Sequence, residues 1–163
     1  MAGPNPHQKP LNLSYLDPHT AHVIQRIISD YPQFTFKISS RFRFYPPKTI
    51  FLGPPEPNYT LLALHELGHA LSKHKDYSTA IERLKIEREA WQRAKTVYSN
   101  YTKQAPELFP HPWDATYDEF TEIQLDTYRD WLHTQSKCPR CGLTRFQTPD
   151  GTFHCPHCDL FTI

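Results

Sequence analysis

Hydrophobic and polar positions recur with two different periods along the chain, and they divide its first part into a helix and strands. Residues 18–31 carry apolar side chains at helical spacing, with a proline at the start and another just past the end, which predicts a helix. Residues 33–40 and 41–45 alternate apolar and polar positions, so each predicts a strand. Residues 48–53 predict a third short strand, which is closed by a proline-rich turn.

In the middle of the chain, apolar residues recur at the spacing of helices. Residues 59–73 and 79–103 predict two helices, and Thr79-x-x-Glu82 has the pattern of a capping box at the start of the second. A third helix begins near Thr116-x-x-Glu119, and its apolar positions are expected to face inward: Phe120, Ile123, Tyr128, Trp131 and Leu132. Strands followed by helices predict an α+β fold in which a short antiparallel or mixed sheet packs on helices.

Length and composition indicate one ordinary domain with small additions at both ends. The 163 residues divide into a proline-rich arm (1–17), a main domain (18–136) and a tail (137–163) that contains all four cysteines. The net charge of +1 gives no general attraction to nucleic acid or membranes. No apolar run is long enough to span a membrane, and the first residues lack the pattern of a secretory signal, so a cytoplasmic location is expected.

The cysteines form two Cys-Pro-x-Cys turns, which are typical of a zinc ribbon. Thirteen residues lie between Cys141 and Cys155, and the two turns are completed by Cys138 and Cys158. Four thiolates close a tetrahedral shell, so this zinc would be structural, with a redox dithiol as the alternative. Basic and aromatic residues beside the turns allow contact with nucleic acid, but they equally fit a solvated face and a small core.

The chemistry-bearing motif lies in the helix 59–73, in the stretch LHELGHAL. His65 and His69 are four residues apart, so they share a helix face and can bind one metal ion. Glu66 follows His65 and can reach the open side of the metal, where it would act as the general base. A hydrolytic zinc commonly has three protein ligands, and the third is not given by the motif.

Several residues remain open as the third ligand. Ser72 and Lys75 stand where a metzincin would have a glycine and a histidine, so that class is excluded. His74 lies in a polar segment at the expected end of the helix and is rotated away from the face of the two histidines. The next helix offers Glu87 and Glu89, which lie on different sides of it, so only one of them can face the metal.

The stretch from HELGHAL to IEREAW resembles the gluzincin peptidases, and most closely the ImmA/IrrE-type peptidases and minigluzincins. Nineteen residues separate His69 from Glu89, which is followed by an alanine, and this resemblance implies Glu89 as the third zinc ligand. It also implies a zincin-like fold with one catalytic zinc in addition to the structural one. The chain departs from the thermolysin-type pattern at Arg93, where that pattern has an aspartate that orients the first histidine.

The sequence is therefore expected to encode a cytoplasmic zinc endopeptidase that cleaves a narrow range of protein or peptide substrates. The substrate would lie extended along the strand 48–52, and the arm 1–17 would cover the cleft. Candidates for stabilising the oxyanion are Tyr77, Tyr98, Tyr101 and His111. Two alternatives stay open: a SprT-like protease acting near DNA, which needs His74 as ligand, and a non-catalytic protein that binds nucleic acid or a partner through its ribbon.

Overall fold

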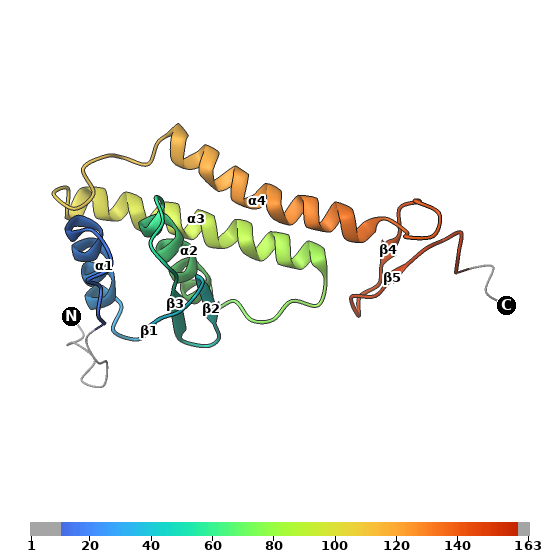
Figure 1. The fold of residues 1–163 in the computed structure, drawn as a ribbon, viewed down its shortest axis with the longest axis horizontal. Coiled ribbons are helices and arrows are strands. Elements are labelled where there is room, and N and C mark those ends of the chain that lie inside the picture. The colour runs from blue at the N-terminus through green and yellow to red at the C-terminus, as the bar shows by residue number, and fades with distance from the viewer. Residues whose placement is uncertain (1–10, 160–163) are drawn as a thin grey trace. The chain divides into compact units, whose positions relative to one another are not determined.

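The computed structural model describes residues 11–159, so most of the predicted arm 1–17 lies outside the described residues. Within that range the chain forms four helices and five strands (Figure 1). The predicted α+β class is confirmed. The helices and strands have the following bounds: α1 Pro18–Asp30, β1 Thr35–Ile38, β2 Arg43–Tyr45, β3 Thr49–Leu52, α2 Tyr59–Leu71, α3 Ala80–Gln104, α4 Ala115–Ser136, β4 Phe146–Gln147 and β5 Phe153–His154.

Contacts between residues divide the chain into two compact units. Among the described residues the first unit comprises 11–75 and 89–114, and the second comprises 76–88 and 115–159. This division differs from the boundary expected near residue 137, because α4 groups with the cysteine tail. Helix α3 contributes residues 80–88 to the second unit and residues 89–104 to the first.

The first unit contains a mixed three-stranded sheet in the order β1-β3-β2. β3 pairs in parallel with β1 and antiparallel with β2. The strand at 48–52, expected to offer a free edge to substrate, is therefore the central strand, and both of its edges are already paired. That expectation was wrong because alternation identifies strands but not their order; the outer strands are β1 and β2.

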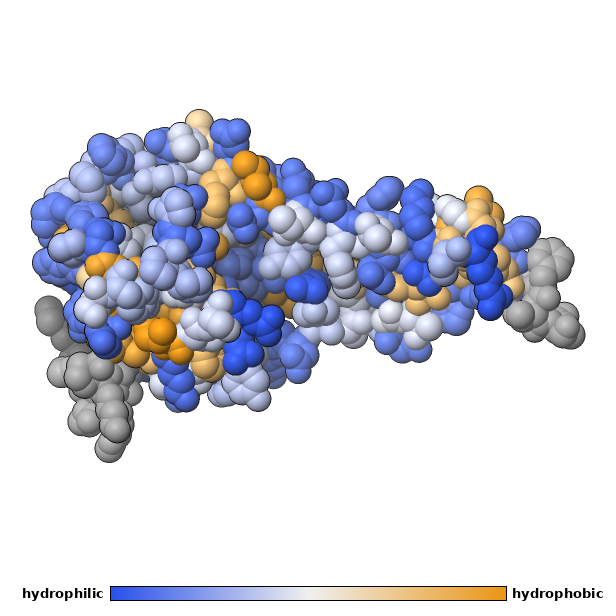
Figure 2. All heavy atoms as spheres, viewed as in Figure 1, coloured by the Kyte–Doolittle hydropathy of each residue, from blue (hydrophilic) through white to orange (hydrophobic). Residues whose placement is uncertain are grey.

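Helices α1 and α2 supply most of the aliphatic core of the first unit. Asp17 caps α1, since its side chain accepts the backbone N–H of Thr20 at 3.0 Å, and Pro18 occupies the first turn. α2 is apolar nearly all round, as a helix buried on several sides must be. The visible surface is largely hydrophilic, with hydrophobic residues in small separate patches (Figure 2). Fully buried side chains of this core are Ile24, Ile27, Ile50, Leu52, Leu64 and Leu67.

α2 and α3 approach each other closely at one point, and a glycine makes this approach possible. A Cβ atom built on Gly68 would lie 2.3 Å from the carbonyl oxygen of Ala90, far inside contact distance. Gly68 therefore admits the backbone of α3, which a residue with a Cβ atom would exclude. Ala90 and Ala94 are fully buried on the same side of α3. This crossing fixes which face of α3 is turned toward the histidines of α2.

In the second unit α3 begins with the predicted capping box, which is confirmed in both directions. The Glu82 amide donates to the Thr79 hydroxyl at 3.1 Å, and the Thr79 amide donates to the Glu82 carboxylate at 3.1 Å. In α4, however, Ile123 and Trp131 are exposed and Leu125 is buried, so the predicted inward face was partly wrong. With few apolar side chains in each turn, the periodicity of α4 did not determine its buried face.

Candidate metal centres

Two imidazoles of α2 point a nitrogen at the same place. The Nε2 atoms of His65 and His69 lie 3.1 Å apart, and both rings are in the core. Two imidazole nitrogens bound to one tetrahedral zinc at roughly 2.0–2.1 Å lie about 3.3 Å apart. The spacing of the two nitrogens therefore fits a shared zinc ion, as the i, i+4 spacing on a helix predicts.

Glu87 of α3 completes a three-residue group with these histidines. Its carboxylate and the ring nitrogens of His65 and His69 all lie within 4.8 Å of one another. The Trp91 ring stacks on His65 with 4.3 Å between the ring centres, and Glu87 is one helical turn before Trp91. Two imidazoles and one carboxylate are a ligand set known from catalytic zinc sites.

Glu89, the ligand implied by the gluzincin resemblance, lies outside this group. Its side chain is 51% exposed, and its carboxylate lies 3.4 Å from Nε2 of His74. A signal for Glu87 was present in the sequence: residues 87, 91, 94 and 98 form one helical stripe, and the last three are apolar. Extending that stripe back by one turn selects Glu87.

The polar and charged side chains buried within residues 11–159 are those of this region. They are His65, Glu66, His69 and Glu87, each less than 9% exposed. Burying carboxylates and imidazoles is unfavourable unless hydrogen bonds or a bound cation compensate. Glu66, the predicted general base, follows directly after His65 on α2, and its side chain is buried.

The other histidine and tyrosine candidates have different positions. His74 contacts the Nδ1 atom of His69, the nitrogen on the far side of the ring from the converging Nε2 atoms. Tyr98 donates its hydroxyl to the carbonyl oxygen of His111 at 3.2 Å, and Tyr101 donates to Asp30 at 3.0 Å. These hydroxyl bonds indicate structural roles for both tyrosines.

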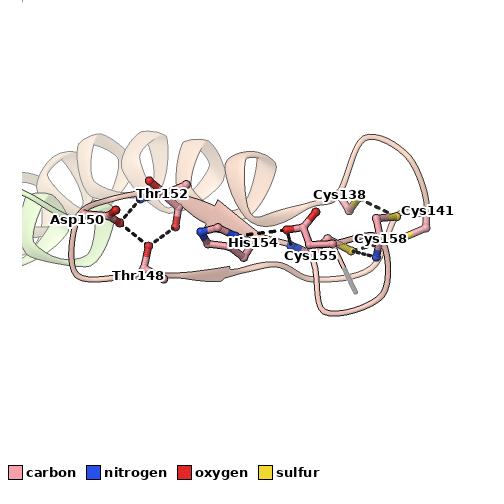
Figure 3. Close-up of polar contacts among 9 residues, drawn as sticks. Cys138, Cys141, Thr148, Asp150, Thr152, His154, Cys155 and Cys158 are labelled. Atoms are coloured by element: carbon pink, nitrogen blue, oxygen red, sulfur yellow. Dashed lines mark hydrogen bonds and ion pairs between the residues drawn. The ribbon is translucent and has the colours of Figure 1, made fainter. Parts of the chain in front are cut away.

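The four cysteines of the second unit converge as the sequence predicts (Figure 3). The Sγ atoms of Cys138 and Cys158 lie 3.8 Å apart, and those of Cys141 and Cys155 lie 3.6 Å apart. Four thiolates at about 2.3 Å from a tetrahedral zinc have neighbouring sulfurs about 3.8 Å apart. The cluster therefore fits a small zinc ribbon.

Backbone geometry builds both cysteine turns in the same way. Gly142 N–H donates to the Cys138 carbonyl at 2.9 Å, and Asp159 N–H donates to the Cys155 carbonyl at 3.0 Å. Backbone N–H groups of Cys141 and Arg140 lower the pKa of the Cys138 thiol to about 6, which favours the thiolate that metals bind. The β4–β5 hairpin joins the two turns, and Gly151 occupies its tip with φ of 89°.

We expect Cys155→Ser to remove one zinc per chain and to unfold the ribbon locally. A tail this short buries little apolar surface, and binding of a structural zinc contributes about 10–16 kcal/mol in comparable small sites. Hydrogen exchange followed by mass spectrometry should show the amides of 137–159 losing protection, while those of α2 keep theirs. Protected hairpin amides in zinc-free protein would show that the metal does not hold this segment together.

Comparison of the chain with protein family models, with curated proteins and with solved structures finds no match. Within residues 11–159, no helix has both the length and the apolar character needed to cross a membrane.

Proposed function

We propose that the chain is a zinc-dependent endopeptidase in which His65, His69 and Glu87 hold the metal and Glu66 is the general base. One observation carries the proposal: the polar side chains buried within the described residues belong to a His-Glu-x-x-His helix and one facing glutamate. A purely structural zinc would be closed by four protein ligands, whereas this group offers three. The cysteine cluster binds a second, structural zinc.

The residues divide the chemistry among them. When bound, zinc acts as a Lewis acid toward water and the scissile carbonyl. Glu66 takes the proton of the attacking water and passes it to the departing amine, which leaves its carboxylate ready for another cycle. Glu87 would balance part of the cation's charge and, together with the two imidazoles, would supply three protein ligands.

Peptide substrate would pair with the outer edge of β2, in place of the strand first expected. β2 is an outer strand, and the Phe44 ring lies parallel to the His69 ring with 6.4 Å between their centres. An extended peptide on this edge would use main-chain hydrogen bonds for affinity and the exposed side chains Arg43 and Tyr45 for selectivity. The proposal is completed by a narrow range of protein substrates and by a cytoplasmic location, which suits four cysteines that form no disulfide.

The geometry gives less support to the two alternatives. A SprT-like site requires His74 as a ligand, and His74 contacts the outer nitrogen of His69. A non-catalytic metal site has no need for a buried glutamate directly after the first histidine. Nucleic acid as a partner has no further support from the described residues of the ribbon.

The proposal is tested by incubating the chain with a library of peptides from digested cell protein and identifying new termini by mass spectrometry. We expect cleavage at a restricted set of sites with the zinc-loaded protein, loss of cleavage after chelation, and recovery on adding zinc. The library samples many sequences, so a narrow preference does not conceal activity. No zinc-dependent termini from this library, with both metal sites filled, would refute the peptidase proposal.

A further inference from the structure

The two ring nitrogens of His69 face different partners. Nε2 lies 3.1 Å from Nε2 of His65, on the side where the metal group converges. Nδ1 lies 2.9 Å from Nδ1 of His74, at hydrogen-bonding distance. A metal-binding histidine generally donates its outer N–H to an acceptor, which fixes the ring and its tautomer. His74 occupies the position of that acceptor.

The end of α2 explains how His74 reaches this position. The helix ends at Leu71, and Lys73 adopts the left-handed conformation with φ of 56°. Lys73 N–H donates to the Ala70 carbonyl at 3.2 Å, and His74 N–H donates to the His69 carbonyl at 3.1 Å. These two bonds form a Schellman motif, which folds the chain back over the last turn of the helix. The backbone thereby sets His74 against His69.

Glu89 lies behind His74. Its Oε2 atom is 3.4 Å from Nε2 of His74, and the His74 side chain is only 9% exposed. A carboxylate at this position favours the proton of neutral His74 on Nε2, which leaves Nδ1 of His74 as an acceptor. His69 then donates from its Nδ1, and its Nε2 lone pair is free to bind metal.

We propose that His74, backed by Glu89, is a positioning residue that holds His69 in the orientation and tautomer that bind zinc. The inference rests on the metal site of the proposed function but does not require peptidase activity. It gives Glu89 a role two residues away from the ligand Glu87 on the same helix. It also supplies an outer partner for the second histidine of the motif, whereas thermolysin-type enzymes orient the first.

The test measures metal affinity on the full chain with the ribbon already filled with zinc. His74→Leu removes the acceptor, and His74→Gln keeps a side-chain oxygen that can accept the His69 proton. His22→Leu, at an exposed histidine of α1, is the matched control. Zinc affinity is measured by competition with a chromophoric chelator, and the ligand geometry is followed by the visible absorption of Co²⁺ in place of zinc.

We expect His74→Leu to weaken zinc binding by roughly ten- to a hundredfold, as losses of outer partners do. His74→Gln should recover most of the affinity, Glu89→Gln should lose less than His74→Leu, and His22→Leu should match the wild type. At saturating Co²⁺ the spectrum of His74→Leu should equal that of the wild type, because the ligands themselves are unchanged. Melting of the metal-free proteins separates this effect from general loss of stability.

Two results would overturn the inference while leaving the metal site in place. Wild-type zinc affinity in His74→Leu would show that His74 does not position His69. A changed Co²⁺ spectrum at saturation would instead make His74 a direct ligand. A wild-type chain that binds zinc only in its ribbon would overturn the inference together with the proposed function, and this result is seen before any variant is made.

Discussion

Replacing Glu87 by alanine is expected to remove the zinc of the α2 site and leave the ribbon zinc in place. Zinc per chain should fall from about two to about one, because a three-ligand site that loses its only carboxylate keeps two neutral imidazoles. The loss of affinity should exceed the roughly 10–100-fold loss that follows removal of an outer hydrogen-bond partner. Elemental analysis after zinc loading and gel filtration, without chelator, gives the count.

Glu89→Ala is the variant to compare with Glu87→Ala, since both remove a carboxylate from the same stretch of α3, and any loss of zinc affinity in Glu89→Ala should be the smaller of the two. It should keep about two zincs per chain under these loading conditions, because Glu89 contacts His74 and not the converging ring nitrogens. Loss of one zinc in Glu89→Ala but not in Glu87→Ala would restore the ligand implied by the gluzincin resemblance. It would also mean that α3 is rotated from the orientation that brings Glu87 close to His65 and His69.

The choice between Glu87 and Glu89 shows what the sequence alone could determine. The histidine pair follows from helical spacing within α2, which is local information. The third ligand depends on the rotation of α3, and that rotation is set by Ala90 against Gly68 and Trp91 against His65. These contacts join parts of the chain more than 20 residues apart, so they do not follow from local sequence. The only indication of them in the sequence is the apolar stripe of α3 that contains Trp91.

The position of His74 could not be predicted because a helical wheel does not apply beyond the end of its helix. In a sequence, the Schellman motif is usually indicated by a glycine at the position that takes the left-handed conformation, and here Lys73 occupies that position. A histidine expected on the wrong side of α2 therefore lies against His69. The cysteine ribbon was predictable for the opposite reason, since each Cys-Pro-x-Cys turn contains its own geometry.

The sheet was predicted in its strands but not in its order. Alternation of apolar and polar residues identified β1 and β2, and the short run closed by a proline-rich turn identified β3, each within a few residues. β3 lies in the centre because it pairs in parallel with β1, and the sequence of a four-residue strand does not indicate whether its partner is parallel or antiparallel. The consequence for function is direct, because β2 rather than β3 has the unpaired edge near His69.

Glu66→Gln is expected to abolish peptide cleavage while leaving about two zincs per chain, because Glu66 is outside the ligand group. Glutamine keeps the size of the side chain and its hydrogen-bonding oxygen but cannot accept the proton of the attacking water. Removing a general base commonly lowers the rate by about 10²–10⁴-fold. The measurement is kcat/KM on a peptide that the wild-type chain cleaves, with zinc content and melting temperature determined on the same samples.

The combination of unchanged zinc and lost cleavage distinguishes a base from a ligand or a structural residue. Glu87→Ala should lose both zinc and cleavage, whereas Glu66→Gln should lose cleavage alone. Glu56→Gln, at an exposed glutamate outside the metal-binding group, should change neither. Cleavage by Glu66→Gln at the wild-type rate would remove Glu66 from the mechanism, and the α2 metal would then need another base or a role without catalysis.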